Sequence, residues 1–262
     1  MLNKYKQTSE GVLRLRKSRG FSLIEMAMVM LILGFLLAGL FTALGESDTN
    51  RRRSEAKTQI DNIVEALYGF AQTTGRIPCP AIATSNGLES VRANTSCRRP
   101  HGFVPASSLG LQGTVNANNL LTDPWGNPYR YSVATYPTGP NQPITAFTTV
   151  AGTQTQFANN GLPAGDANLL CVSAEVACGA PILTDIAPAL VYSMGEDFGL
   201  VPSTTYQEEN ASQGVAGFLM ATDNNFVTRD YAAEGANQFD DILVWMSVNT
   251  LNSRLIAAGK LP

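Results

Sequence analysis

The sequence has a single histidine and only four cysteines, so many catalytic and metal sites lack their usual side chains. His101 is the sole imidazole that could act as a general base, which leaves a serine or cysteine triad without further support. No phosphate-binding glycine loop, G-x-S-x-G turn or H-E-x-x-H helix occurs either. We therefore expect no enzymatic activity and a structural role for His101.

Charged residues are also scarce, at 15% of the chain, and they are unevenly distributed. Residues 1–20 carry six basic side chains against one acidic one, Glu10, so the remainder is more acidic than the formal charge of −3 for the whole chain. The largest basic cluster of that remainder, residues 51–53, is flanked by acids. Because nucleic-acid-binding proteins usually present a basic face, we expect no nucleic acid partner.

No two cysteines form a C-x-x-C pair, and one histidine offers little to a zinc site. In an exported domain such cysteines normally form disulfides. Three connectivities are possible, and we favour the two local bridges, Cys79–Cys97 and Cys171–Cys178. Free buried thiols are the alternative.

One long apolar run contrasts with this otherwise polar chain. Residues 21–44 contain one charge, Glu25, and few other polar groups. As a helix the run would span about 36 Å, enough to cross a hydrocarbon core of about 30 Å. The run exceeds the 7–15-residue apolar core typical of a secretory signal peptide. Because the preceding segment is basic, we predict a single span with a cytoplasmic leader and an exported C-terminal part.

Glu25 is the residue that a simple anchor does not explain. An ionised carboxylate within a bilayer costs on the order of 3 kcal/mol at mid-depth and therefore needs a partner. If the chain is cut after Gly20, the new amine of Phe21 lies one helical turn away and can pair with Glu25, most usefully with that of a neighbouring subunit. A Glu25 that merely reaches the membrane interface is the alternative.

Basic residues, Gly20, the run Phe21-Ser22-Leu23-Ile24-Glu25 and an apolar helix together resemble the processing signal of type IV prepilins and type II secretion pseudopilins. The resemblance implies that prepilin peptidase cuts between Gly20 and Phe21 and methylates Phe21, and that Glu25 guides assembly. A competing small-residue site for signal peptidase lies at Ala43-Leu44-Gly45 and would release a soluble protein. The length of the apolar run and the presence of Glu25 argue against that site.

Helical periodicity continues beyond the apolar run. Apolar side chains form one stripe at three- and four-residue steps: Ile60, Ile63, Val64, Leu67, Phe70 and Ala71. Gly75 and the prolines after it end the pattern. We thus predict a helix from Phe21 to about Thr74, with residues 21–44 in a membrane or filament core, 45–75 amphipathic, and 76–262 an exported globular head.

The head has an α+β pattern without repeats or a second domain. The predicted strands are Arg130–Tyr136, Ile144–Val150, Leu190–Met194, Phe226–Asp230 and Ile242–Ser247. A closing helix is predicted over Thr250–Ala258, with Asn249 as its cap and Gly259 as its stop. Residues 137–189 are turn-rich and should hold long loops with one or two strands. The resemblance implies a pilin-like lollipop, a long N-terminal helix packed on an antiparallel sheet with extended loops.

Two stretches of the head add to the resemblance. Asp123-Pro124-Trp125-Gly126-Asn127-Pro128-Tyr129-Arg130-Tyr131 is similar to the DPWGxPYxY stretch of major pseudopilins, and its residues indicate a structural turn before a strand. Residues 193–199 and 239–245 resemble the segments that bracket the calcium-binding loop of that family. The resemblance implies Ca²⁺ ligands at Asp197, Asp240 and Asp241, whose hard oxygen atoms suit this ion. The chain departs from the family by an insertion, Leu200–Gln238, and by Phe198 at a position where glycine is expected; capping of a turn by Asp240 and Asp241 is the alternative.

Three functions are compatible with these features. The first is a pseudopilin or minor pilin of the bacterial inner membrane, with a periplasmic head, whose partners are prepilin peptidase, other pilin subunits and the inner-membrane assembly platform. The large head favours a minor or accessory member. The second is a pilus-tip adhesin or uptake subunit, and the third is a singly anchored periplasmic enzyme.

Overall fold

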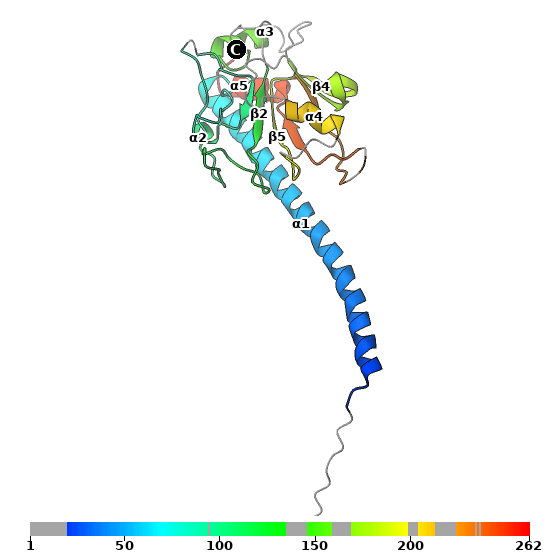
Figure 1. Cartoon of the computed structure of the whole chain (residues 1–262). Helices are drawn as coiled ribbons and strands as arrows, with labels where there is room; N and C mark the ends of the chain where they lie inside the picture. The colour runs from blue at the N-terminus through cyan, green and yellow to red at the C-terminus, as the bar shows by residue number, and fades with distance from the viewer. Residues whose placement is uncertain are drawn as a thin grey trace, which may run out of the picture. The chain divides into compact units, whose positions relative to one another are not determined.

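The structure, a computed structural model, describes the chain in several stretches (Figure 1). They are residues 20–93, 95–134, 146–158, 169–198, 204–212, 224–233, 235 and 237–262, without the side chains of 37–47 and 212. The predicted leader, residues 1–20, lies outside the described residues except for Gly20. Contacts between residues divide the chain into two compact units, Met1–Asp48 and Thr49–Pro262.

Helix α1 spans Leu23–Thr74 and ends where the sequence predicts. Gly75 follows it with φ +78°, a backbone conformation that residues with a Cβ adopt rarely. The predicted apolar stripe is confirmed: Ile60, Ile63 and Leu67 are fully buried. Burying each such side chain stabilises the head by roughly 1.5–3 kcal/mol.

The central sheet of the head is antiparallel, as predicted, with the strand order β1-β2-β5-β7 (Figure 1). Its strands are β1 (His101–Phe103), β2 (Arg130–Val133), β5 (Ala189–Ser193) and β7 (Ile242–Trp245). One hydrophobic cluster contains residues of α1, of the sheet, of the turn before β2 and of the C-terminal part of the chain: Ile60, Ile63, Val64, Leu67, Ala71, Tyr129, Tyr131, Val191 and Leu251. The fold is therefore α+β, with the second half of the long helix forming part of the core of the head.

A second sheet has the order β4-β3-β6. Its strands are β3 (Leu170–Glu175), β4 (Gly179–Ala187) and β6 (Asn225–Val227). Of these, β3 and β4 lie in residues 137–189, where one or two strands among loops were predicted without bounds, and β6 overlaps the predicted strand Phe226–Asp230. Strands β3 and β4 form a hairpin around the 3-10 turn η1 (Val176–Cys178), whereas β3 and β6 pair in parallel. This second sheet is thus mixed, whereas the central sheet is antiparallel. Strand β4 carries Pro181 and is largely exposed, as is typical of an edge strand.

Both disulfides are present. Cys79 is joined to Cys97, and Cys171 is joined to Cys178 across the β3–β4 turn. No free cysteine remains. Each bridge closes a short local loop. The first constrains a segment in which regular structure is sparse, and the second joins strand β3 to the turn η1 that follows it.

Two local predictions were wrong. The strand predicted at Ile144–Val150 is replaced, in its described part, by a turn and by helix α3 (Val150–Ala158). Thr149 caps that helix, since its hydroxyl accepts a hydrogen bond from the Gly152 amide at 3.0 Å. Helix α5 spans Val248–Ala257 and begins before the predicted cap Asn249, because Ser247 accepts from the Thr250 amide instead. Helices α2 (Ala106–Leu109) and α4 (Thr205–Ser212) were not predicted.

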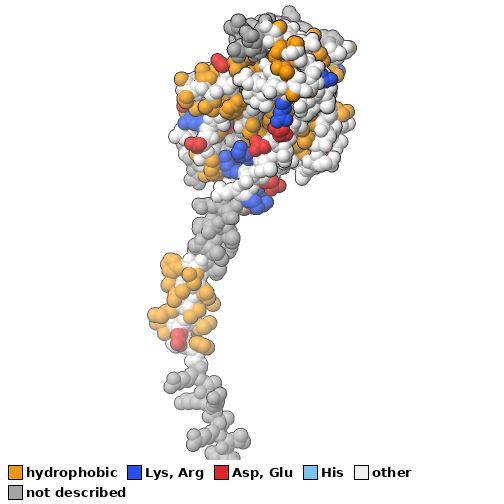
Figure 2. Space-filling view, turned by 180° about the vertical axis from the view of Figure 1, so that it is seen from behind, with side chains coloured by type: hydrophobic (Ala, Val, Ile, Leu, Met, Phe, Trp, Pro, Cys, Tyr) orange, Lys and Arg blue, Asp and Glu red, His pale blue; other side chains and the backbone are white. Residues whose placement is uncertain are grey.

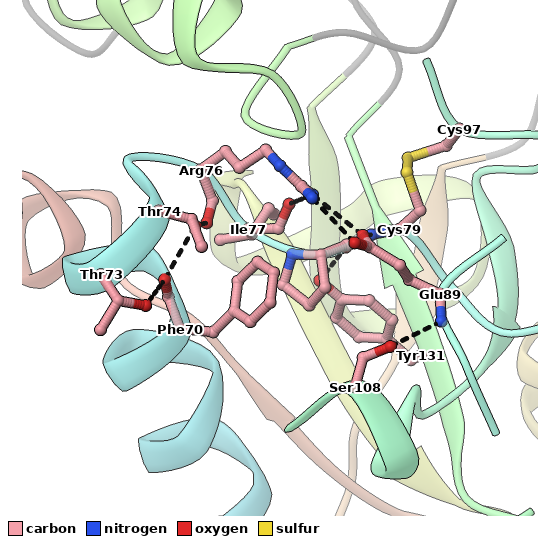
Figure 3. Close-up of polar contacts among 11 residues, drawn as sticks. Phe70, Thr73, Thr74, Arg76, Ile77, Cys79, Glu89, Cys97, Ser108 and Tyr131 are labelled. Carbon is pink, nitrogen blue, oxygen red and sulfur yellow. Dashed lines mark hydrogen bonds and ion pairs between the residues drawn. A yellow bond between two sulfur atoms is a disulfide. The ribbon is translucent and has the colours of Figure 1, made fainter. Parts of the chain in front are cut away.

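An ion pair fixes the chain where it leaves α1. Figure 3 shows Arg76 and Glu89 pointing toward one another beside the Cys79–Cys97 bridge. Arg76 donates to both carboxylate oxygens of Glu89 at 2.9 and 2.8 Å, and the Cys79 amide donates to the same carboxylate at 3.1 Å. Burial alone would raise the pKa of Glu89, but these hydrogen bonds and the charge of Arg76 outweigh it and lower that pKa.

We expect Glu89→Gln to lower the free energy of unfolding at pH 7 by about 1–3 kcal/mol, because Arg76 and the Cys79 amide lose a charged acceptor. Since folding lowers the pKa of Glu89, its ionised form stabilises the head above the ordinary value of 4.5, and this contribution disappears as the pH falls through the lower folded value. The difference between wild type and variant should therefore shrink toward pH 3. Urea unfolding followed by tryptophan fluorescence at pH 7 and pH 3 measures it.

Glu65→Gln is the matched control. Glu65 pairs with Arg254, but its side chain is 60% exposed, so its loss should change the free energy of unfolding by no more than about 1 kcal/mol. Equal effects of the two substitutions, or a Glu89→Gln effect of full size at pH 3, would contradict the assignment.

Candidate functional site

The first part of α1 presents apolar side chains to solvent. Every residue from Phe21 to Leu36 is exposed, and Leu23 reaches 89%. Figure 2 shows hydrophobic side chains covering this part of the helix on the face in view. Such a continuous apolar surface on a single chain marks a site that contacts lipid or other proteins. Within the residues whose side chains are described, no helix has an apolar stretch long enough to be a candidate membrane span.

Glu25 lies in the first turn of α1, as the sequence indicates. Its carboxylate accepts a hydrogen bond from the backbone N–H of Ser22 at 3.2 Å. Ser22 precedes the first helical residue and Glu25 is the third, so Ser22-Leu23-Ile24-Glu25 has the spacing of a capping box. The positive end of the helix dipole also favours an acid here. Sequence reasoning missed this local role, although the S-x-x-E spacing could have revealed it.

The aromatic turn that starts at Asp123 is built around the side chain of that residue. One carboxylate oxygen accepts from the backbone amides of Trp125 at 3.0 Å and Asn127 at 2.9 Å, and the other accepts from the Ser193 hydroxyl at 2.6 Å. Burial raises the pKa of Asp123, against the effect of these hydrogen bonds. The Asn127 side chain in turn donates to the Gly195 carbonyl at 2.8 Å. The contacts of the turn support the structural role predicted for it.

Two of the three predicted calcium ligands lie together. Asp240 accepts at one carboxylate oxygen from the backbone amides of Glu196 at 2.6 Å and Asp197 at 3.3 Å. Gln207 of α4 donates to Asp240 and to Asp197, both at 2.8 Å. Burial, and then the neighbouring charge of Asp240, raise the pKa of Asp197 to about 6.

The third predicted ligand, Asp241, has a separate partner. It is buried and accepts from the Asn210 side chain at 2.7 Å, and burial raises its pKa well above the ordinary value. Calcium requires six to eight oxygen atoms directed at one point. Here both carboxylate oxygens of Asp240 and one of Asp197 already accept from N–H donors of the chain, and Asp241 is held by Asn210 instead. One oxygen of Asp241, Oδ1, is buried without a hydrogen-bond partner in the part of the chain that the structure describes. The three aspartates therefore do not direct six to eight free oxygen atoms at one point, and the residues present do not fit that ion. No group of three or more His, Cys, Asp or Glu arranged to hold a metal occurs among the described residues.

The packing around Gly195 and Phe198 accounts for the residue type at each of these two positions. Gly195 has φ +67°, and a Cβ there would collide with the Asp240 carboxylate. The Cζ atom of the buried Arg130 guanidinium lies 5.4 Å from the centre of the Phe198 ring and 5.1 Å from the centre of the Phe103 ring. Phe198 therefore packs against a buried cation, which a glycine could not do.

His101 lies in strand β1 and is 2% exposed. Its Nδ1 atom lies 2.9 Å from the Ser132 hydroxyl, and its ring lies 6.0 Å from that of Phe226. These neighbours place the only imidazole of the chain inside the head, between its two sheets.

Comparison with known proteins assigns the N-terminal segment and the first part of the head. The model of the prokaryotic N-terminal methylation motif matches residues 15–41, which include Gly20, Phe21 and Glu25. The model of type II secretion system protein G matches residues 43–147. No solved structure gives a significant match. A helix with an exposed apolar start, a prepilin methylation motif and an α+β head together define a pilin-like subunit.

Two curated relatives carry the name type II secretion system core protein G. The one from Pseudomonas aeruginosa is 30% identical over 116 residues, which are 44% of this chain and 74% of that protein. The one from Vibrio cholerae is 26% identical over 118 residues, or 45% of this chain and 73% of that protein. The chain therefore belongs to the protein G family of type II secretion pseudopilins.

We expect Asp123→Ala to lower the free energy of unfolding by about 2–4 kcal/mol, because the Trp125 and Asn127 amides and the Ser193 hydroxyl lose their acceptor. Denaturant unfolding of the full chain in detergent measures the change. Asp61→Ala is the control, since Asp61 is 55% exposed and only approaches Lys57 at 3.9 Å. A similar small effect for both variants would show that the turn does not depend on Asp123.

Proposed function

We propose that the chain is a structural subunit of a type II secretion pseudopilus. The observation that carries this proposal is the uninterrupted exposure of residues 21–36 within a matched methylation motif. Exposed apolar side chains are removed from water when such helices enter a membrane or pack together in a filament. The resemblance to protein G supports the pseudopilus over the tip-adhesin alternative, and the family is one of structural subunits rather than enzymes.

In this proposal prepilin peptidase cuts between Gly20 and Phe21 and methylates the new N-terminus. Residues 1–20 are then a cytoplasmic leader, 21–44 the membrane and filament-core part of the helix, 45–75 its amphipathic part, and 76–262 the head. The precursor is anchored in the inner membrane by a single pass, with its head in the periplasm. Its partners are the other pseudopilins and the inner-membrane assembly platform.

The role proposed for Glu25 follows from its position. In the single chain its carboxylate is exposed and bonded only weakly to the Ser22 amide at 3.2 Å. Cleavage creates a cation at Phe21, one turn away. In an apolar filament core, pairing of that cation with Glu25 of a neighbouring subunit neutralises both charges and fixes the axial offset between helices.

The length of the chain supports a minor or accessory subunit. The aligned part covers 74% of the Pseudomonas aeruginosa protein but only 44% of this chain, so this chain is the longer one. The family match ends at residue 147, whereas the second sheet and α4 follow it. These additions enlarge the head beyond what a compact major subunit contains.

The processing part of the proposal is tested by the intact mass and N-terminal sequence of the protein purified from membranes. The expected product begins at N-methyl-Phe21. A product that begins at Glu46, or one that keeps the leader, would rule out prepilin processing.

The assembly part is tested with Glu25→Ala and Glu25→Lys. Both variants should be cleaved and remain stable, yet incorporation into pseudopili should fall at least about tenfold, because loss of an ion pair in an apolar core exceeds 1.4 kcal/mol. Cross-linking of sheared pseudopili and immunoblotting measure incorporation. Glu65→Ala, an exposed acid on the same helix, is the control. Wild-type incorporation of both Glu25 variants would refute the role of Glu25.

A further inference from the structure

Helix α4 (Thr205–Ser212) lies in the insertion of this chain. It directs two carboxamides at Asp197, Asp240 and Asp241, which we call the acidic cluster. Gln207 and Asn210 are three positions apart and therefore lie on the same face of the helix. Both residues are buried, at 3% and 0% exposure, whereas Glu208 between them is exposed. The insertion thus contributes polar groups to the interior of the head.

The Gln207 side chain is fully engaged as a bridge. Its Nε2 atom has two hydrogens, and it donates to Asp197 Oδ2 and to Asp240 Oδ1 at 2.8 Å each. Its Oε1 atom accepts from the Thr204 hydroxyl at 3.5 Å. Because both acidic partners require a donor, the orientation of the amide is fixed by its neighbours.

Asn210 makes a corresponding set of contacts. Its Nδ2 atom donates to Asp241 Oδ2 at 2.7 Å and to the Val227 carbonyl at 2.8 Å, and its Oδ1 atom accepts from the Val227 amide at 2.9 Å. One face of α4 therefore contacts all three aspartates and holds strand β6 beside them. The polar atoms of the Asn210 carboxamide all have partners, which favours a single orientation of this side chain, whereas Asp241 Oδ1 is buried without a hydrogen-bond partner among the described residues.

A positive charge for this cluster also comes from the chain. Arg53 of α1 donates to the backbone carbonyl of Asp240 at 2.7 Å, and its guanidinium lies 4.1 Å from the centre of the Tyr231 ring. Burial lowers the pKa of Arg53, and the negative charges of Asp240 and Asp241 partly offset that decrease. Arg53 and the two carboxamides together provide the charge and the donors that an ion would otherwise provide.

We propose that the Gln207 carboxamide takes the place of a divalent cation in this head, by bridging Asp197 and Asp240, so that the head is stable without calcium. A cation that bridges Asp197 Oδ2 and Asp240 Oδ1 would have to occupy the position from which Nε2 now donates to both oxygens, and the two cannot occupy that position together. Gln207, which would replace the cation, thus belongs to the insertion Leu200–Gln238 by which this chain departs from the calcium-binding pattern. This inference concerns the head alone and holds whether or not the chain assembles as proposed above.

The test compares the thermal unfolding of the full mature chain in detergent, in EGTA and in about 1 mM CaCl₂, a concentration that fills most extracellular calcium sites. We expect the wild-type Tm to agree in the two buffers. Gln207→Ala should lower Tm by about 5 °C in both, because two carboxylates lose a donor. Gln154→Ala, in which an exposed glutamine of α3 is replaced, is the matched control and should leave Tm unchanged.

Gln207→Glu converts the bridge into a fourth carboxylate. We expect a Tm below that of Gln207→Ala in EGTA, because like charges face each other, and a rise of several degrees in CaCl₂, because ligand binding stabilises the folded state. Calcium-dependent stabilisation of the wild type would overturn the proposal, and so would a Gln207→Ala variant no less stable than Gln154→Ala. The wild-type response to calcium and the comparison of Gln207→Ala with Gln154→Ala test the proposal even if Gln207→Glu does not fold.

Discussion

The apolar surface of residues 21–36 is the constraint on which the rest of the molecule depends. Each of these residues is exposed in the single chain, and burying one large apolar side chain is worth roughly 1.5–3 kcal/mol. Covering this segment with lipid or with other helices therefore stabilises the chain. A charge inside such a covered segment must be compensated, so the position of Glu25, one turn from the proposed new amine at Phe21, has a physical reason.

The same helix meets a different requirement after Thr49. There only one stripe is apolar, and the sheet and α5 cover it, with Ile60, Ile63 and Leu67 in the common core. Beyond Gly75 the chain is held by the Arg76–Glu89 pair and a disulfide rather than by regular structure. One continuous helix thus serves two environments, and its change of surface pattern marks where one requirement ends and the other begins.

The parts that could be predicted from sequence are those with a periodic or local signal. The α1 stripe repeats over several turns, and Leu190–Met194 is a short apolar run, so the helix and β5 were both predicted. One or two strands were predicted within residues 137–189, but the β3–β4 hairpin could not be located there, because β4 is exposed and lacks clear alternation. Contacts such as Gln207 with Asp240 were not predictable, because they join polar residues that are distant in sequence and follow no period. The motif predicted Asp197, Asp240 and Asp241 as one set of ligands, whereas Gln207 bridges only Asp197 and Asp240, and Asp241 bonds to Asn210.

The acidic cluster shows how a pseudopilin head can be fixed by its own chain. Three carboxylates at one end of the sheet require donors and positive charge, and both can come from an ion or from side chains. In this head Asn210 contacts Asp241 and both backbone groups of Val227, while the Tyr192 hydroxyl lies 3.4 Å from the Asn210 carbonyl. Helix α4, strand β6 and the cluster are therefore held as one unit. An ion would leave this unit sensitive to the calcium content of its surroundings, whereas carboxamides stabilise it to the same extent at any calcium concentration.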